Sequence, residues 1–137
     1  MGIESQKWLS FCITYKTREE YLIMASIYNF KIDQSATFYR KLIWIDKNKI
    51  PINTTGVIAK MQFKQLPSTN VIALDLTSEN SGIIVSDDGV IEIKITALQT
   101  KTLTYSSYVY DLFITDIGGT VIKLIEGKIT VSKAVTN

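Results

Sequence analysis

The chain of 137 residues is the size of one domain, and its 46% hydrophobic and 20% charged residues are typical of a globular protein with a single core. Its 15 basic and 13 acidic residues give a formal charge of +2 and include no basic run, which argues against nucleic-acid binding. Because the chain contains no histidine, it lacks the commonest general base and metal ligand, and much hydrolytic and zinc chemistry is excluded.

Residues 1–25 differ from the rest of the chain and are predicted to form an N-terminal extension. Apolar side chains alternate from Leu9 to Tyr15, which favours a strand. Thr17 and Glu20 have the spacing of a capping box, which favours the start of a short helix. We therefore expect a strand and a short helix ahead of the main domain.

The extension also carries candidate partner-binding residues. Trp8 and Phe11 give it more apolar surface than an unattached tail would carry, and this surface suits a neighbouring sheet edge or a partner's groove. Met24 is a plausible translation start, so residues 1–23 are a candidate addition that related chains lack. The single Cys12 has no cysteine to pair with and no histidine to activate it, and we expect it to be unreactive.

Residues 26–137 are predicted to form one all-β domain, because apolar residues recur with a period of two between turn signals. The first clear strand has Phe38, Leu42 and Trp44 on one face, and the polar residues 46–49 after it suit a hairpin. In the next strand the residues expected to face inward are Val57, Ala59, Met61 and Phe63, and those expected to face water are Lys60, Gln62 and Lys64.

The middle of the domain is predicted to hold a short strand at 71–76, a turn at 78–82 and a hairpin at 83–95. The hairpin turns at Asp87-Asp88-Gly89, where aspartate and glycine tolerate the unusual backbone angles of a tight turn. Residues 96–104 lack alternation, and we expect them to cross the end of the domain with room for one helical turn.

The C-terminal part is predicted to be a second hairpin that turns at residues 116–119. The inward residues of its first strand are Tyr108, Tyr110, Leu112 and Ile114. Those of its second strand are Val121, Ile125, Ile129 and Val131, with Gly127 on the same side. The missing side chain at Gly127 indicates either a bulge or a neighbouring aromatic residue pressed against the backbone.

The expected fold is an immunoglobulin-like antiparallel β-sandwich of seven to nine strands, because short strands with turn signals at this spacing suit two packed sheets. A small barrel is the alternative.

Acidic residues in turns are the best candidates for a calcium site, since calcium takes oxygen ligands from loops. These residues are Glu79, Asp87, Asp88 and Asp116. Turns favour such residues for backbone reasons alone, and the sequence has no ligand spacing for calcium, so we expect no metal and no cofactor. Asp75 and Asp111 are further carboxylates, but no pattern in the sequence places two of them in one cleft, and no catalytic residue is assigned.

Tyr39 and Phe113 are candidate partner-binding residues, because each lies on the opposite face from its inward neighbours. Arg40, in contrast, shares the inward face with Phe38 and Leu42. We expect its charged end either to reach water at a sheet edge or to pair with a carboxylate.

Several segments together resemble a known group of proteins. They are Tyr28 to Phe38, Trp44, Ile52 to Gly56, Ala59 to Gln62, Tyr108 to Leu112, Asp116, Gly119 to Val121 and Leu124 to Ser132. They are similar to segments of small virion proteins of tailed phages, and the chain resembles the immunoglobulin-like N-terminal domain of siphophage baseplate upper proteins. Residues 1–23 lie outside the resemblance, and Arg40 stands where an apolar residue would be usual.

The resemblance implies a non-enzymatic structural protein of a virion, made in the host cytoplasm, that attaches receptor-binding parts to a tail. Its expected partners are other virion proteins, with the chain itself homo-oligomeric or present in many copies. No apolar stretch approaches the roughly 18 residues that span a bilayer, so neither membrane nor nucleic acid is an expected partner. Two other hypotheses are a capsid decoration protein and a carbohydrate-binding module that recognises host surface glycan through Tyr39, Phe113 or Trp8.

Overall fold

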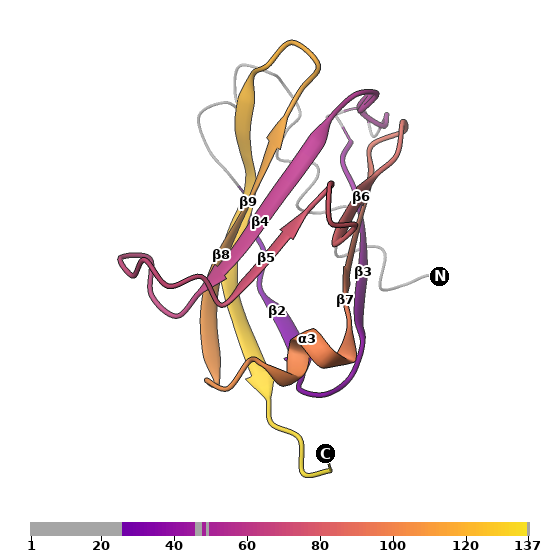
Figure 1. Cartoon of the computed structure of the whole chain (residues 1–137). Helices are drawn as coiled ribbons and strands as arrows, with labels where there is room; N and C mark the ends of the chain where they lie inside the picture. Colours follow the sequence, from indigo (N-terminus) through magenta and orange to yellow (C-terminus); the bar gives the residue numbers. More distant parts are fainter. Residues whose placement is uncertain (1–25, 46–47, 49, 137) are drawn as a thin grey trace.

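The computed structural model describes residues 26–45, 48 and 50–136 of the chain (Figure 1). The elements in chain order are β1 (Ser26–Ile27), β2 (Phe30–Asp33), β3 (Phe38–Ile43), β4 (Ile58–Lys64), β5 (Leu74–Thr77), β6 (Ile83–Val85), β7 (Val90–Ile95), α3 (Ala97–Lys101), β8 (Ser107–Thr115) and β9 (Val121–Ser132). The described part is dominated by strands, as the period-two pattern predicts.

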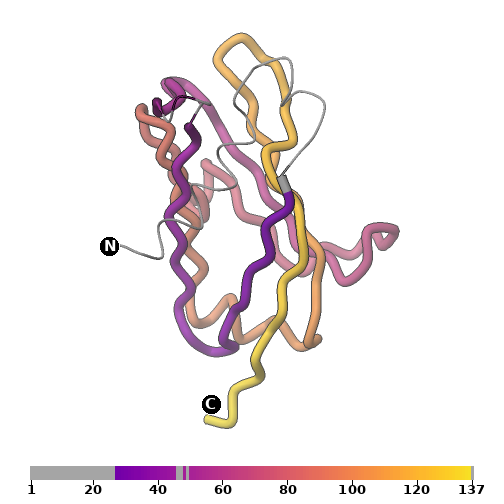
Figure 2. The backbone as a smooth tube through the Cα atoms, turned by 180° about the vertical axis from the view of Figure 1, so that it is seen from behind, coloured from indigo at the N-terminus to yellow at the C-terminus, as the bar shows by residue number. Residues whose placement is uncertain are grey.

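The strands form two sheets that face each other. In one sheet the order is β1-β9-β8-β4-β5, with β2 also on β9, and in the other it is β3-β7-β6. Strands β1 and β2 run parallel to β9, whereas all other pairs are antiparallel. Figure 2 shows β2 alongside β9. This division of strands between two sheets, with crossovers between them, is that of an immunoglobulin-like sandwich, so the predicted fold class is confirmed.

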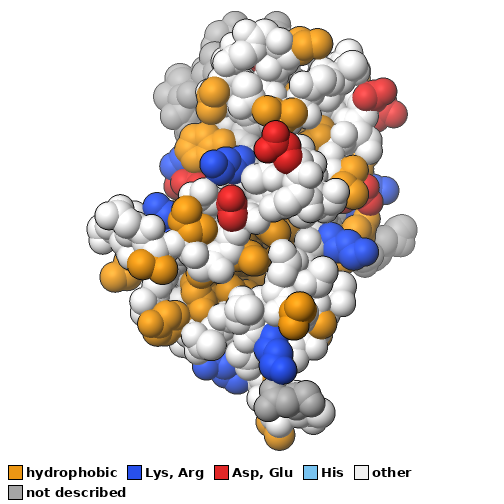
Figure 3. All heavy atoms as spheres, viewed as in Figure 1, with side chains coloured by type: hydrophobic (Ala, Val, Ile, Leu, Met, Phe, Trp, Pro, Cys, Tyr) orange, Lys and Arg blue, Asp and Glu red, His pale blue; other side chains and the backbone are white. Residues whose placement is uncertain are grey.

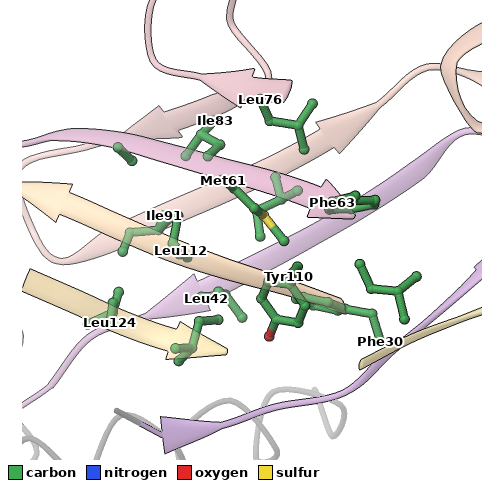
Figure 4. Packing of buried hydrophobic residues seen from close by; sticks show 14 of the residues in the cluster. Phe30, Leu42, Met61, Phe63, Leu76, Ile83, Ile91, Tyr110, Leu112 and Leu124 are labelled. Carbon is green, nitrogen blue, oxygen red and sulfur yellow. The ribbon is translucent and has the colours of Figure 1, made fainter. Parts of the chain in front are cut away.

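The core lies between the two sheets and is made by the inward residues of both. In β8 and β4 every second side chain is buried, including Tyr108, Leu112 and Met61. Figure 4 shows Met61, Leu112 and Leu124 of the larger sheet packed toward Leu42 and Ile91 of the smaller one. The predicted inward faces of these strands are confirmed.

The predicted hairpin at residues 46–49, most of which lie outside the described residues, does not join β3 to β4. β3 pairs with β7, and β4 pairs with β5 and β8, so consecutive strands lie in different sheets. An isolated bridge between Ile45 and Pro51 is the only pairing found in the described part of this crossover. Each strand has one apolar face, and placing the two strands in opposite sheets buries both faces against each other.

The predicted inward face of β9 is correct in its second half and wrong in its first. Leu112 pairs with Ile125 while Phe113 pairs with Lys123, so a bulge leaves one extra residue in β9. Because a bulge shifts the alternation of side chains, Ile122 is buried before it and Val121 is 61% exposed.

Gly127 lies where two segments of backbone come into contact. A Cβ atom at this position would lie 2.3 Å from the carbonyl oxygen of Tyr28 and 2.8 Å from Oδ1 of Asn29. The neighbour pressed against Gly127 is therefore main chain, and not the ring of an aromatic residue. The Tyr110 hydroxyl donates a hydrogen bond to the Tyr28 carbonyl, which holds this crossing in place.

Both ends of the connection between β7 and β8 are fixed by side chains. Thr96 and Gln99 form a capping box at the start of α3, so the predicted helical turn is present. At the start of β8 the Tyr108 hydroxyl accepts a hydrogen bond from the N–H of Tyr105 at 2.9 Å. This contact resembles the tyrosine corner of immunoglobulin-like domains.

Candidate protein-contact surfaces

The predicted partner-binding residues lie on separate surfaces. Tyr39, in β3, is 52% exposed on the outer face of the smaller sheet. Phe113, in β8, is half-buried on the outer face of the larger sheet. Trp8 and Phe11 lie outside the described residues. Tyr39 and Phe113 therefore cannot contribute to one binding site within a single chain.

Phe113 lies in a row of side chains that crosses the larger sheet. Its cross-strand neighbours are Lys60 on β4 and Lys123 on β9. The Lys123 Nζ atom lies 5.8 Å from the centroid of the Phe113 ring and 3.0 Å from Oε1 of Glu126. Lys60 has no ion pair among the described residues. The row combines an apolar ring with one paired and one unpaired cation.

The next row of the same face is acidic. Asp111 on β8 lies between Gln62 on β4 and Glu126 on β9, and Gln62 in turn lies beside Asp75 on β5, to which its Nε2 donates a hydrogen bond at 3.4 Å. Asp75 and Asp111, the two carboxylates considered in the sequence, thus share a face but stand on either side of Gln62.

A hollow of about 560 Å³ opens over these rows, and we call it the outer groove. The residues that line it include Ile27, Lys60, Lys64, Pro67, Val109 and Phe113. Figure 3 shows hydrophobic, basic and acidic side chains interspersed on the visible face, without a large area of one charge. Such a mixture suits contact with another macromolecule more than the capture of a simple ion.

The acidic turn residues do not gather into a metal site in the part of the chain that the structure describes. Glu79 lies in the turn before β6, and Asp87 and Asp88 lie in the turn before β7. Asp116 accepts hydrogen bonds from the N–H groups of Gly118 and Thr120, both at 2.9 Å. The Asp116 carboxylate therefore holds its own turn, and no group of three potential ligands occurs among the described residues.

On the outer face of the smaller sheet, the Tyr39 hydroxyl donates a hydrogen bond to Oε2 of Glu92. This bond is the main cause of a raised pKa of Tyr39, and burial and the negative charge of Glu92 act in the same direction. Lys41 is the cross-strand partner of Glu92 but forms no ion pair with another described residue.

Arg40 points inward from β3, which is an edge strand of the smaller sheet. Its guanidinium donates to the Tyr28 hydroxyl at 2.7 Å and lies 5.2 Å from the ring centroid of Phe38 and 5.4 Å from that of Phe30. The predicted pairing with a carboxylate does not occur among the described residues, where the guanidinium instead lies beside aromatic rings. Arg40 closes the side of the sandwich between β3 and β2.

Sequence reasoning missed most residues of the outer groove. The outward positions of Lys60 and Lys64 can be read from the alternation of β4, but their neighbours on β8 and β9 depend on strand pairing. Strict period-two alternation would place Lys123 and Glu126 on opposite faces of β9, and the bulge in β9 brings them to the same face. No signal in the sequence locates that bulge.

The comparisons with known proteins identify no family for this chain. No family model matches the chain, and no curated protein matches it. The chain is similar to CopC from Methylosinus trichosporium OB3b, at 13% identity over 79% of this chain and 89% of that one, with a TM-score of 0.42. It is also similar to a chain in a structure that addresses T cell specificity and activation by the bacterial superantigen toxic shock syndrome toxin-1, at 10% identity over 76% and 92%, with a TM-score of 0.45.

The strand order of the two sheets defines the class of the domain, which is an immunoglobulin-like β-sandwich. In the described part of the chain no helix is long and apolar enough to span a membrane.

Proposed function

We propose that this chain is a non-enzymatic structural protein of a tailed-phage virion, located in the tail, baseplate or fibre-attachment region and acting through contacts with other virion proteins. The proposal begins from the sequence resemblance to small virion proteins. The fold is compatible with it, because a sandwich is a rigid support on which faces and edges can contact neighbours.

The observation that carries the contact role is the outer groove. Its lining combines apolar side chains, including Phe113 and Val109, with charged side chains of both signs. Protein interfaces combine apolar anchors with polar and charged surroundings in this way. A decoration protein on a capsid would use the same chemistry, and location in the particle distinguishes the two roles.

The proposal is tested by mass spectrometry of purified virions, together with particles made with Phe113→Ala. We expect the chain in wild-type virions at a fixed copy ratio, and reduced incorporation of the Phe113→Ala variant. Tyr105→Ala, an aromatic residue that is 52% exposed and does not line the outer groove, is the matched control and should be incorporated normally. Absence of the wild-type chain from virions would refute the proposal.

A carbohydrate-binding role is the second candidate, and one observation favours it. The half-buried Phe113 ring lies in the groove near Gln62 and Asp111, and aromatic rings beside polar groups are a common arrangement in small-molecule sites. A glycan array probed with purified wild-type chain and Phe113→Ala tests this role. Binding that Phe113→Ala abolishes would support it, and an array without signal would exclude it for the glycans present.

A further inference from the structure

Each sheet of a sandwich ends in edge strands whose main-chain groups on one side have no sheet partner, and such edges can accept an added strand. The described sheets have edges at β1 and β2, β5, β3 and β6. These edges differ in length and in how far their main-chain groups are already hydrogen-bonded.

β3 is the longest of these edges, with six residues. Just beyond it, the N–H of Trp44 donates to the Gly89 carbonyl at 2.8 Å. Residues of an antiparallel pair alternate between bonding to the partner strand and pointing away from it, so the even-numbered residues of β3 bond to β7. The residues whose N–H and C=O groups point out of the sheet are Tyr39, Lys41 and Ile43, and no hydrogen bond to these groups occurs in the described structure.

The β5 edge is closed by a side chain. Asn80 accepts a hydrogen bond from the N–H of Thr77 and donates one to the carbonyl of Asp75, both at 2.9 Å. Asn80 Oδ1 also accepts from the N–H of Gly82. The amide of Asn80 thus occupies main-chain groups of β5 that an incoming strand would need.

The other two edges are short. β6 has three residues, and β2 has four. At the end of β2 the carbonyl of Asp33 already accepts a hydrogen bond from the N–H of Ala36. Between β1 and β2 the backbone at Tyr28 and Asn29 is pressed against Gly127 and interrupts the edge.

We propose that the β3 edge accepts an extended strand of a partner virion protein, with an acidic side chain of that strand beside Lys41. The donors and acceptors that point outward at alternate residues match those of a β-strand backbone. Lys41 is exposed and has no ion pair among the described residues, so a carboxylate opposite it would be stabilised. This inference rests on the proposed function and adds the β3 edge, on the smaller sheet, as a contact site separate from the outer groove.

Proline substitution on full-length chains tests the inference, because proline removes an N–H donor. Lys41→Pro removes an outward N–H without removing a bond to β7, and Lys41→Ala keeps that N–H. Lys31→Pro is the matched control on β2: Tyr28 and Gln34 donate their N–H groups to β9, so by alternation the N–H of Lys31 points outward. We expect all three variants to melt as cooperatively as wild type. Incorporation into virions should fall about tenfold for Lys41→Pro and stay within about twofold for Lys31→Pro.

Hydrogen exchange of the wild-type chain, free and in virions, provides a second measurement. In the free chain the amides of Tyr39, Lys41 and Ile43 should exchange fast while those of Arg40 and Leu42 are protected. In virions the three fast amides should become protected. If these three amides become protected when the free chain is simply concentrated, the strand that pairs with β3 comes from a second copy of the chain. That result would overturn the assignment to a partner protein.

The outcomes distinguish this inference from the proposed function. A chain that is present in virions with its β3 amides still fast would overturn the inference alone. A chain that is absent from virions would overturn both. Incorporation that fails with Lys31→Pro and persists with Lys41→Pro would place the contact on β2 and contradict the proposal.

Discussion

Trp44 is a large residue of the core that lies just after β3 and is 3% exposed. Its backbone also links the two loops at this end of the sandwich, because its carbonyl accepts from the N–H of Ile52 and its N–H donates to Gly89. We expect Trp44→Ala to lower the free energy of unfolding by about 3–5 kcal/mol, the usual effect of deleting a buried aromatic side chain.

Lys60→Ala is the control for this prediction, because Lys60 is exposed on β4 and its loss should change the free energy of unfolding by less than about 0.5 kcal/mol. Urea unfolding of both variants is the measurement. Equal stabilities for the two would contradict the assignment of sheet faces.

The hydrogen bond from Tyr39 to Glu92 predicts a pH effect. Glu92→Gln removes the carboxylate that raises the pKa of Tyr39, so that pKa should fall toward the ordinary value for tyrosine. NMR titration of the tyrosine Cζ signals measures the change, with Tyr39→Phe identifying the signal. Glu79→Gln removes a carboxylate from the turn before β6 and should leave the pKa of Tyr39 unchanged.

The sign of the linked stability effect follows from the direction of the shift. Since the pKa of Tyr39 is higher in the folded chain than in the unfolded one, the bond stabilises the fold below the unfolded pKa of about 10. This contribution is lost as the pH rises through the folded pKa. The effect on stability is small because Tyr39 is largely exposed.

The close approach of the Tyr28 backbone to Gly127 predicts that a side chain at position 127 would destabilise the fold. Gly127→Ala would place a Cβ atom 2.3 Å from the Tyr28 carbonyl oxygen, and relieving the overlap requires β1 and β2 to move away from β9. We expect a loss of about 1–3 kcal/mol in the free energy of unfolding. Gly118→Ala is the matched control, since its Cβ would meet only Asp116 Oδ1 at 3.4 Å. Two variants of equal thermal stability would show that the crossing is not tightly packed.

At the level of the element, Asn80 fixes the turn between β5 and β6 and closes the β5 edge. Asn80→Ala removes the hydrogen bonds to Thr77, Gly82 and Asp75. We expect the free energy of unfolding to fall by only about 1–2 kcal/mol, because these hydrogen bonds are partly exposed to water. Chemical denaturation measures it, with Glu79→Ala as an exposed neighbour expected to be neutral. If Asn80→Ala left the free energy of unfolding unchanged, water would fully replace the hydrogen bonds of this side chain.

Local alternation was sufficient to predict the hairpins β6 with β7 and β8 with β9, because each pair is joined by a short turn. It was not sufficient for β3, whose pairing with β7 joins residues about fifty positions apart. Period-two patterning determines which face of a strand is buried but not which strand lies beside it. The parallel contacts of β1 and β2 with β9 have no local signal for the same reason.

The candidate contact residues, too, could be predicted from the sequence only in part. The outward positions of Tyr39 and Phe113 could be predicted from their own strands. Their separation onto different sheets depends on strand pairing, as does the row that joins Phe113 to Lys60 and Lys123. The closed β5 edge and the open β3 edge depend on individual hydrogen bonds that a sequence pattern does not contain.

For the whole molecule, the first residues of the described core are Phe30 and Ile32, both in β2. We expect a chain that begins at Met24 to melt within a few degrees of the full chain and to be incorporated poorly into particles, because the removed segment carries Trp8 and Phe11. Both lengths are compared by thermal melting and by particle incorporation. If the shorter chain is unfolded, residues 1–23 are part of the sandwich. If the shorter chain is incorporated normally, residues 1–23 have no role in assembly.

The central claim is that this sandwich works by contact with other proteins of a virion. Quantitative mass spectrometry of highly purified virions tests it most directly, with peptides from β4 and β8 as reporters. We expect these peptides at a constant molar ratio to a major virion protein through successive purification steps. A ratio that falls toward zero as the particles are purified would contradict it.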